Sequence, residues 1–269
     1  MTFDRSGLAR DEIYRLSFFV GSREIDFRSR LSPTSLCYFL QDIASCHAAS
    51  AGVDIADLLK IGKTWMLSRL NLIVNNLPRW KDYLDLFTWP VGVKSLFATR
   101  DFVALDKSGN TVAVATSSWL IVDLKSRKPV RVNRYIERMK LLNELRALDK
   151  YLIRPDYNLE GMNWVKPHRE KVGLDDIDVN GHFTSMKYIE KILFNIDEDF
   201  RQDNELKEIE IYYMSEVLKG EELTYEYAFT ERSSRNEGDF NKNRSLIHRV
   251  IGYDNRLVSL ARTSWINLK

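Results

Sequence analysis

Three polar residues in the second half of the chain have types and spacing that suit the cleavage of an acyl bond. Asp178, Asn180 and His182 occupy alternate positions just ahead of an expected helix. In an extended segment these side chains, together with that of Asp176, would point to the same side. Gly181 lets the backbone approach a ligand closely, and the first N–H groups of a helix can stabilise a developing oxyanion. Together these features indicate acyl transfer chemistry.

The simplest alternative for this segment is a helix cap. A single Asp or Asn ahead of a helix is more often an N-cap than a catalytic group. A cap needs only one side chain, however, so it does not account for an aligned carboxylate, amide and imidazole. Glu216 is a second candidate, because it stands at the end of an expected strand and just before a turn. A glutamate at such a place is usually a solvated surface residue.

An internal repeat sets these residues in context. The sequence Ala-Thr-Ser-Ser-Trp at 115–119 recurs as Ala-Arg-Thr-Ser-Trp at 261–265, an offset of 146 residues. Applied to the segment 178–182, this offset selects residues 32–36 in the first half. There the places of the three polar residues are taken by Ser32, Thr34 and Leu36. Two units of similar length are therefore expected, and only the second carries the polar set.

The same comparison applies to Glu216. Alignment of the turns that follow, at residues 81–82 and 220–221, places Leu77 opposite Glu216. The first half is expected to fold without polar groups at either place, so a structural requirement does not explain them. This asymmetry favours a functional site in the second half.

Each half is expected to contain one helix followed by four or more antiparallel strands. Ser32 is a natural N-cap and Pro33 suits the first helical position. Residues with helical spacing then form an apolar stripe in each half: Leu36, Phe39, Leu40, Ile43 and His47 in the first, and Met186, Ile189, Leu193 and Ile196 in the second. Turn residues and apolar patterns predict the strands 65–74, 83–91, 98–106, 111–124, 208–217, 222–230, 245–253 and 257–268. This order is an α+β design.

The expected boundaries are a first repeat over residues 1–140, a linker over 141–160 and a second repeat over 161–269. No run of 18 apolar residues exists and the first thirty residues mix charges with short apolar stretches, so neither a membrane span nor a secretory signal is expected. Cys37 and Cys46 fall on opposite faces of the expected helix and cannot form a disulfide there, which fits a reducing cytoplasm.

Charge and motifs argue against several classes of function. The 40 basic and 38 acidic residues leave a formal charge of +2, so no global field attracts nucleic acid or an anionic membrane. His182 has no His or Cys at the spacing of a metal ligand, and neither a G-x-S-x-G motif nor a phosphate or dinucleotide loop occurs. A metal site, serine hydrolase chemistry and nucleotide binding are therefore poorly supported by the residues.

At these residues the chain resembles the acyl-acyl carrier protein thioesterases of plants and bacteria, over nearly its whole length. The second half carries D-x-N-x-H at 178–182 ahead of Lys187-Tyr188-Ile189, and the later glutamate falls at Glu216. The first half shares a further set of features: Trp65 before Arg69, the Pro78-Arg79-Trp80 turn, Thr88-Trp89, Arg100-Asp101-Phe102 and the signature at 115–119. One departure is Phe183-Thr184-Ser185, where family members commonly have Val-Asn-Asn.

The resemblance implies two tandem hotdog repeats, each an antiparallel sheet wrapped around a central helix. It also implies hydrolysis of fatty acyl-acyl carrier protein to free fatty acid, which ends chain elongation, without a metal or cofactor. Glu216 and His182 would activate a water, Asp178 would orient the site, and Asn180 would hydrogen-bond the thioester carbonyl. The first repeat, which lacks the polar set, would supply the acyl pocket.

The partner implied by the resemblance is an acyl carrier protein, which is acidic. Between Lys125 and Lys140, seven basic residues stand with the single acid Glu137, a net charge of +6. This segment is either a docking surface or a solvated linker face. A monomer is physically sufficient, and a homodimer stays open because pairing of two such chains is common on this fold.

Two other functions stay open from the sequence. The pattern D-x-D-x-x-G-H, at 176–182, also occurs in hotdog thioesterases that act on acyl-coenzyme A. Those enzymes more often assemble identical chains. Here a single chain contains one repeat with the polar residues and one repeat without them. The other alternative is a non-catalytic acyl-binding hotdog module. The altered residues 183–185 favour it slightly, and the retention of all four site residues weighs against it.

Overall fold

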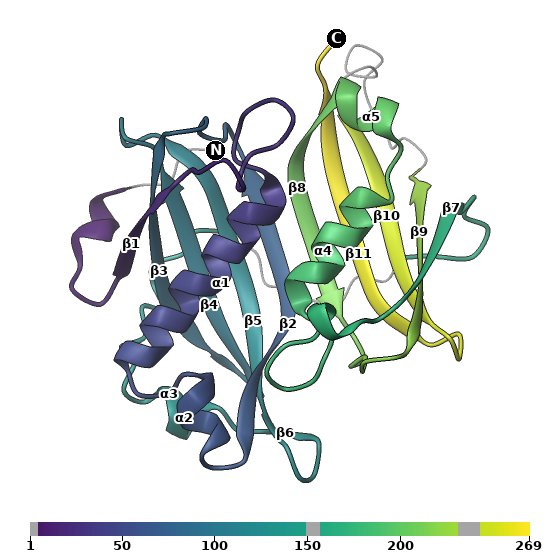
Figure 1. The fold of residues 1–269 in the computed structure, drawn as a ribbon. Helices are drawn as coiled ribbons and strands as arrows, with labels where there is room; N and C mark the ends of the chain where they lie inside the picture. The colour runs from purple at the N-terminus through teal and green to yellow at the C-terminus, as the bar shows by residue number, and fades with distance from the viewer. Residues whose placement is uncertain (1–4, 149–156, 231–242) are drawn as a thin grey trace. The chain divides into compact units, whose positions relative to one another are not determined.

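Each half of the fold consists of antiparallel strands with a helix lying across one of their faces (Figure 1). The computed structural model describes residues 5–148, 157–230 and 243–269. Its contacts divide the chain into unit 1, residues 1–152, and unit 2, residues 153–269. Each unit therefore has a core of its own.

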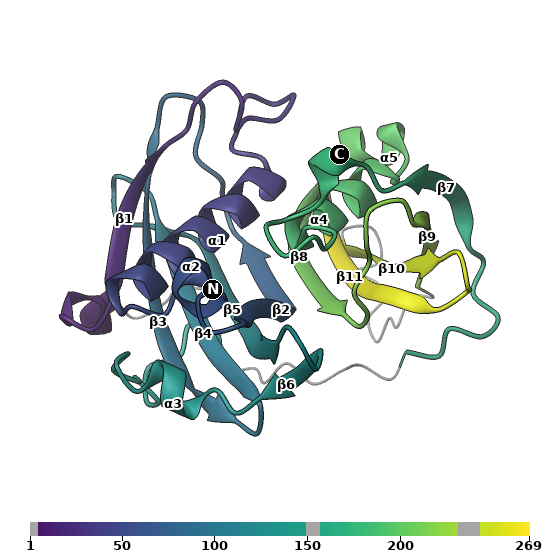
Figure 2. The same ribbon diagram turned by 60° about the horizontal axis from the view of Figure 1, so that its bottom comes forward.

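In unit 1 the sheet has the strand order β1-β3-β4-β5-β2, and every neighbouring pair is antiparallel (Figure 2). Its strands are β1 (Tyr14–Phe19), β2 (Lys63–Val74), β3 (Tyr83–Lys94), β4 (Phe97–Leu105) and β5 (Thr111–Asp123), with the short β6 (Lys128–Val130) paired to β5. Its helices are α1 (Pro33–Ser50), α2 (Ile55–Leu59) and α3 (Asn133–Ile136), after an initial 3-10 helix, η1 (Arg5–Ala9).

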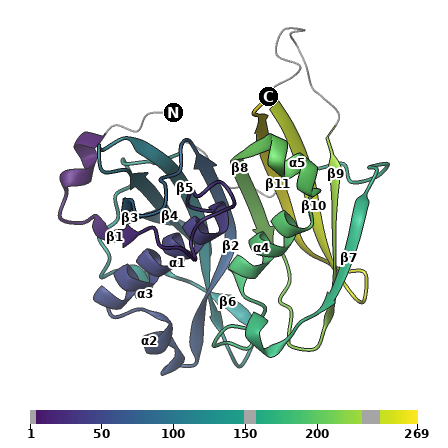
Figure 3. The ribbon, with the colours of Figure 1, turned by 45° about the horizontal axis from the view of Figure 1, so that its top comes forward.

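In unit 2 the strand order is β7-β9-β10-β11-β8, again antiparallel throughout (Figure 3). Its strands are β7 (Val165–Lys171), β8 (Asn204–Tyr213), β9 (Glu222–Phe229), β10 (Asn243–Gly252) and β11 (Leu257–Asn267). Its helices are α4 (Ser185–Phe194) and α5 (Glu198–Asp203), with the 3-10 helix η2 (Leu174–Asp176) ahead of α4. The two strand orders match position by position, which confirms the internal repeat.

The central helix of unit 1 starts where its sequence predicts. The hydroxyl of Ser32 accepts a hydrogen bond from the N–H of Ser35 at 3.0 Å, and Pro33 occupies the first helical position. The expected apolar stripe faces the sheet, and Leu36 and Ile43 have no exposed surface. Burial of one such side chain stabilises the unit by about 1.5–3 kcal/mol relative to leaving it in water.

The expected α+β design is confirmed. All eight expected strands are present, with ends that differ by at most four residues from the expected ones. The edge strands β1 and β7 are not among the expected strands. Each is placed by pairing with a distant strand. Of the expected linker, residues 149–156 lie outside the described residues.

The offset of 146 residues is wrong for the loop ahead of the central helix. It holds for β4 and β5, which begin 146 residues before β10 and β11. The N-caps of α1 and α4, Ser32 and Thr184, are 152 positions apart, because matching segments of the two units differ in length. Asp178 and His182 therefore lie ahead of the helix start and do not match Ser32 and Leu36.

Candidate active site

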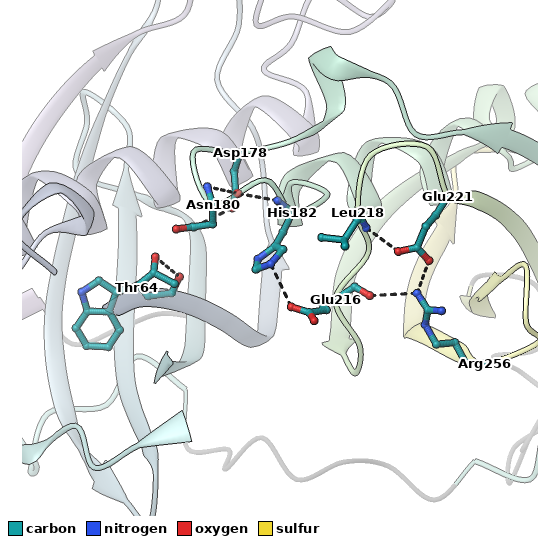
Figure 4. A network of polar contacts seen from close by, with 9 residues as sticks. Thr64, Asp178, Asn180, His182, Glu216, Leu218, Glu221 and Arg256 are labelled. Carbon is teal, nitrogen blue, oxygen red and sulfur yellow. Dashed lines mark hydrogen bonds and ion pairs between the residues drawn. The ribbon is translucent and has the colours of Figure 1, made fainter. Parts of the chain in front are cut away.

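Asp178 organises the loop that carries the other two polar residues of the segment. Its Oδ1 accepts the backbone N–H groups of Asn180 at 2.8 Å and His182 at 3.2 Å, and its Oδ2 accepts the side-chain amide of Asn180 at 3.3 Å (Figure 4). Gly181 has a φ of +76°, a left-handed conformation that glycine adopts without strain. A Cβ on Gly181 would meet no heavy atom within 4 Å, so the backbone is open there. The loop is a tight turn that presents Asn180 and His182.

The extended conformation expected for this segment is wrong. Asp176 ends the 3-10 helix η2, and its Oδ2 accepts the N–H of Gly173 at 2.9 Å. The interpretation of Asp178 or Asn180 as a helix cap is also wrong. The N-cap position of α4 is Thr184, six residues after Asp178. The polar segment is therefore a turn in its own right, separate from the helix that follows it.

Unit 1 contains the same turn. Asp26 holds it through Oδ1, which accepts the N–H groups of Arg28 at 2.8 Å and Arg30 at 3.1 Å, and Ser29 has a φ of +58°. Counted back from the two N-caps, Asp26 matches Asp178 and Arg28 matches Asn180. Ser29 matches Gly181, and Arg30 matches His182. The asymmetry between the halves therefore holds for the asparagine and the histidine, whose places are taken by arginines. It is wrong for the aspartate, which both units use to hold the turn.

Glu216 reaches the same place from another segment of unit 2. Its Oε2 lies 3.1 Å from Nε2 of His182 (Figure 4). The imidazole side chain is 14% exposed and the carboxylate side chain 38%, so the histidine is mostly shielded while the glutamate meets solvent. A carboxylate and an imidazole within hydrogen-bond reach can move a proton between them and a reacting group. The pair is therefore the part of the candidate site that is arranged for proton transfer.

Backbone pairing brings Glu216 to the histidine. Glu216 lies three residues beyond the end of β8, in the loop that leads to β9. The N–H of Phe183 donates to the carbonyl of Val217 at 2.8 Å, and His182 forms a β-bridge with Leu218. The turn after Glu216 is therefore fastened to the loop of His182 by main-chain contacts.

The matching turn of unit 1 confirms the alignment of Glu216 with Leu77. There the N–H of Leu31 donates to the carbonyl of Pro78 at 2.8 Å, in the same pattern. Leu77 is 7% exposed and is an ordinary core residue. A glutamate at this place is thus a feature of unit 2 that the shared turn does not require.

Residues 183–185, which differ from the Val-Asn-Asn common in the family, lie behind the loop in the packing. Phe183 is buried and packs edge-on against Tyr188, with ring centroids 4.6 Å apart. The carbonyl of Ser185 accepts the hydroxyl of Tyr213 at 2.9 Å, which ties the start of α4 to β8. Phe183 and Ser185 thus contact the helix and strand behind the loop rather than the four polar side chains.

Unit 1 holds an apolar cavity of about 70 Å³. Six of its wall residues are Ala44, Ala48, Trp65, Trp119, Ile136 and Met139. The small side chains of Ala44 and Ala48 on α1 leave space here. One water needs roughly 10–15 Å³ of such volume, so the cavity admits several groups of that size. No cavity residue had been predicted, and the alanines were the one signal that could have found it.

One wall of this cavity carries a charge. Arg100 is 7% exposed and donates to Nδ1 of His47 at 3.0 Å and to the hydroxyl of Thr88 at 3.1 Å. Burial, and then the charge of Arg100, lower the pKa of His47 to about 3, so His47 is neutral and can accept this hydrogen bond. Burial lowers the pKa of Arg100 to about 10, which leaves it charged at neutral pH.

The described residues offer no metal site. Within 5–148, 157–230 and 243–269, no three His, Cys, Asp or Glu side chains are placed to bind one ion. None of the helices in these ranges has both the length and the apolar character of a membrane span.

Two family models match the chain. The acyl-ACP thioesterase N-terminal domain matches residues 11–139, and the acyl-ACP thioesterase C-terminal domain matches residues 163–267. An acyl-[acyl-carrier-protein] hydrolase of Cuphea viscosissima is 24% identical, over 94% of this chain and 62% of its own length. The oleoyl-acyl carrier protein thioesterase 2 of Arabidopsis thaliana is 23% identical, over 76% of this chain and 59% of its own length. The chain thus spans about three-fifths of the length of the curated relatives it matches.

Solved structures share the fold. An acyl-ACP thioesterase from Bacteroides thetaiotaomicron has a TM-score of 0.72 and 25% identity, over 95% of this chain and 98% of that one. The 12:0-ACP thioesterase of Umbellularia californica has a TM-score of 0.81 and 19% identity, over 94% of each chain. These likenesses confirm the tandem hotdog architecture.

Proposed function

The chain belongs to the acyl-ACP thioesterase family, and we propose that it hydrolyses the thioester of a fatty acyl-acyl carrier protein to free fatty acid and carrier protein. The observation that carries this proposal is the 3.1 Å contact between His182 and Glu216. The same two turns of unit 1 carry Arg30 and Leu77, which have no such chemistry. Release of the acyl chain would end its elongation.

In the proposed mechanism, the pair of Glu216 and His182 takes a proton from a water molecule. The oxygen of that water bonds to the carbonyl carbon of the thioester, and the carbon–sulfur bond then breaks as a proton passes to the leaving sulfur. The amide nitrogen of Asn180 gives one N–H to Asp178 and offers the other to the thioester carbonyl. Asp178 acts by holding the loop through its two backbone hydrogen bonds.

We assign the acyl chain to the apolar cavity of unit 1. Alkyl groups gain free energy when they leave water for such a space, by about 0.8 kcal/mol for each methylene. The cavity walls include two tryptophans and the small side chains of Ala44 and Ala48. Unit 1 would thus bind the chain, and unit 2 would carry the hydrolytic groups.

Replacing Ala48 by leucine is expected to shorten the acyl chains that are released. Ala48 lines the cavity, so three added carbon atoms take space from the substrate. The measurement is the distribution of free fatty acids released from a graded series of acyl-acyl carrier proteins. Ala49→Leu is the matched control, because Ala49 is the next residue of α1 and is exposed. If both variants give the wild-type distribution, the cavity does not hold the acyl chain.

For the carrier protein, we propose the basic segment 125–140 as the docking surface. Its seven basic residues are all exposed: Lys125, Arg127, Lys128, Arg131, Arg134, Arg138 and Lys140. On its inner side Tyr135, Ile136 and Met139 are buried, and the last two line the cavity. The segment is therefore anchored to unit 1 rather than loosely solvated. Its outer charge complements an acidic partner.

Release of free fatty acid from three substrates tests the proposal: acyl-acyl carrier protein, acyl-coenzyme A and a neutral acyl-pantetheine thioester. We expect the highest kcat/KM with the carrier protein, falling as salt rises because salt screens the charges that attract the partner. Turnover of the neutral thioester should not respond to salt. Preferred hydrolysis of acyl-coenzyme A would favour the coenzyme A thioesterase instead. Absence of turnover with all three would refute a hydrolase and favour an acyl-binding module.

We place the protein in a reducing compartment, the cytoplasm. Cys46 is an exposed free thiol, and Cys37 is a buried one whose pKa burial raises to about 12. Thiols that stay unpaired are typical of reducing compartments.

A further inference from the structure

Arg256 holds the backbone of the proposed catalytic glutamate. It lies just ahead of β11, and its Nη2 donates to the backbone carbonyl of Glu216 at 3.3 Å (Figure 4). The same nitrogen donates to Oε2 of Glu221 at 2.5 Å, and Nη1 donates to Asp254 at 2.9 Å. One guanidinium therefore joins the turn between β8 and β9 to the turn between β10 and β11.

Glu221 extends this contact to the loop of the histidine. Its Oε2 accepts the hydrogen bond from Arg256, and its Oε1 accepts the N–H of Leu218 at 2.8 Å. Leu218 forms the β-bridge with His182. Both residues of the proposed proton-transfer pair are thus attached to the guanidinium through a single turn. The contact is partly shielded from water, since the side chains of Arg256 and Glu221 are 29% and 18% exposed.

The turn itself does not need an arginine. In unit 1, Asp82 closes the matching turn, where its Oδ2 accepts the N–H of Arg79 at 2.9 Å. The offset of 146 residues between β5 and β11 matches Arg256 with Asn110, whose side chain donates to Asp106 at 3.0 Å, inside its own turn. The bridge between two turns therefore belongs to the unit that carries the His–Glu pair.

We propose that Arg256 is a positioning residue for the hydrolysis, an inference that rests on the proposed function. Its contacts run to the carbonyl and carboxylate oxygens of the two turns rather than to the imidazole. By fixing the carbonyl of Glu216, it keeps the carboxylate of that residue within reach of His182. A displacement of about 1 Å in such a pair can lower a rate by about 10²-fold. The forked guanidinium suits this task, because it serves several acceptors at fixed angles.

The kinetics of Arg256→Gln, Arg256→Lys and Arg249→Gln test this role. Arg249 pairs with Glu226 at 2.6 Å and is 26% exposed, so the control removes an ion pair of the same kind and burial from unit 2. We expect kcat of Arg256→Gln to fall by about 10- to 100-fold with little change in KM. Lysine should restore part of the loss, and Arg249→Gln should keep the wild-type kcat. A kcat for Arg256→Gln equal to that of Arg249→Gln would overturn the inference.

Crystal structures of the same variants provide a readout that does not depend on activity. We expect the 3.1 Å contact between His182 and Glu216 to be broken in Arg256→Gln and retained in Arg249→Gln. If the wild type releases no fatty acid, the proposed function fails, while this distance still decides whether Arg256 positions the glutamate. An unchanged distance in Arg256→Gln refutes the positioning role. Arg256→Lys keeps the charge and supplies the same comparison if the glutamine variant does not fold.

Discussion

Replacing His182 by alanine is expected to lower kcat for the acyl-carrier thioester by about 10³-fold, since a positioned proton-transfer group contributes roughly 10²–10⁴-fold. Glu216→Gln should show a loss of similar size, because an amide keeps the shape of the side chain but cannot take up the proton. The double variant should lose no more than either single one, since two groups 3.1 Å apart act as one unit. Steady-state kcat and KM of the three variants measure this.

His168→Ala is the matched control for the histidine. Nε2 of His168 lies 3.7 Å from Glu170 on β7, so this is a second His–Glu pair in unit 2. Its removal should leave kcat at the wild-type value. His182→Ala should change the free energy of unfolding by less than about 1 kcal/mol, because Glu216 is 38% exposed and water screens the pair. Additive losses in the double variant would contradict a shared role, and full activity of His182→Ala would refute the mechanism.

The fold could be predicted because each unit repeats patterns that are local in the sequence. The helix α1 has a capping serine, a proline at its start and a stripe with helical spacing, all between Ser32 and His47. Strand β7 escaped prediction, because Val165–Lys171 includes a proline, a histidine and several charges. Its conformation is fixed by pairing with β9. That pairing is a contact with a distant segment, which no local pattern records.

Glu216 shows why part of the site could not be derived from the residues alone. A glutamate shortly after a strand has no local mark of function. Only the comparison with Leu77 in the other repeat and the resemblance to a family pointed to it. What brings it to His182 is the docking of one turn on another, through the hydrogen bond from Phe183 to Val217. The alanines of α1 were a local signal for the cavity. Small side chains on a helix can allow either close packing or a cavity, however, and which one forms depends on the residues that face them.

The equivalence of the two turns was present in the sequence and was hidden by a single offset. Val20-Gly21 and Ile25-Asp26 recur as Val172-Gly173 and Ile177-Asp178, 152 positions later. The helices that follow have 18 and 10 residues, so the offset changes along each unit. Comparison of each element separately would have matched the aspartates, and it would have shown that an acidic residue at this place serves the turn itself.

Asp178→Ala and Asp26→Ala are expected to destabilise the protein by similar amounts and to differ in catalysis. Each Oδ1 accepts two backbone N–H groups of its turn, at 2.8 and 3.2 Å in unit 2 and at 2.8 and 3.1 Å in unit 1. Loss of such a side-chain acceptor costs about 0.5–2 kcal/mol. Only the turn of unit 2 carries Asn180 and His182, so kcat should fall by about 10²-fold in Asp178→Ala alone. Urea unfolding and steady-state kinetics measure the two effects.

Asp178→Asn separates an anchor from a proton acceptor. An amide oxygen still accepts the two backbone N–H groups, so the turn keeps its shape, while the amide cannot take up a proton. We therefore expect Asp178→Asn to retain most of the kcat that Asp178→Ala loses, and Asp26→Asn to behave as the wild type. Equal losses of kcat in Asp178→Asn and Asp178→Ala would instead place Asp178 in the proton transfer beside Glu216 and His182. In that case the role shared with Asp26 would account for the shape of the turn. It would not account for the loss of kcat in Asp178→Asn.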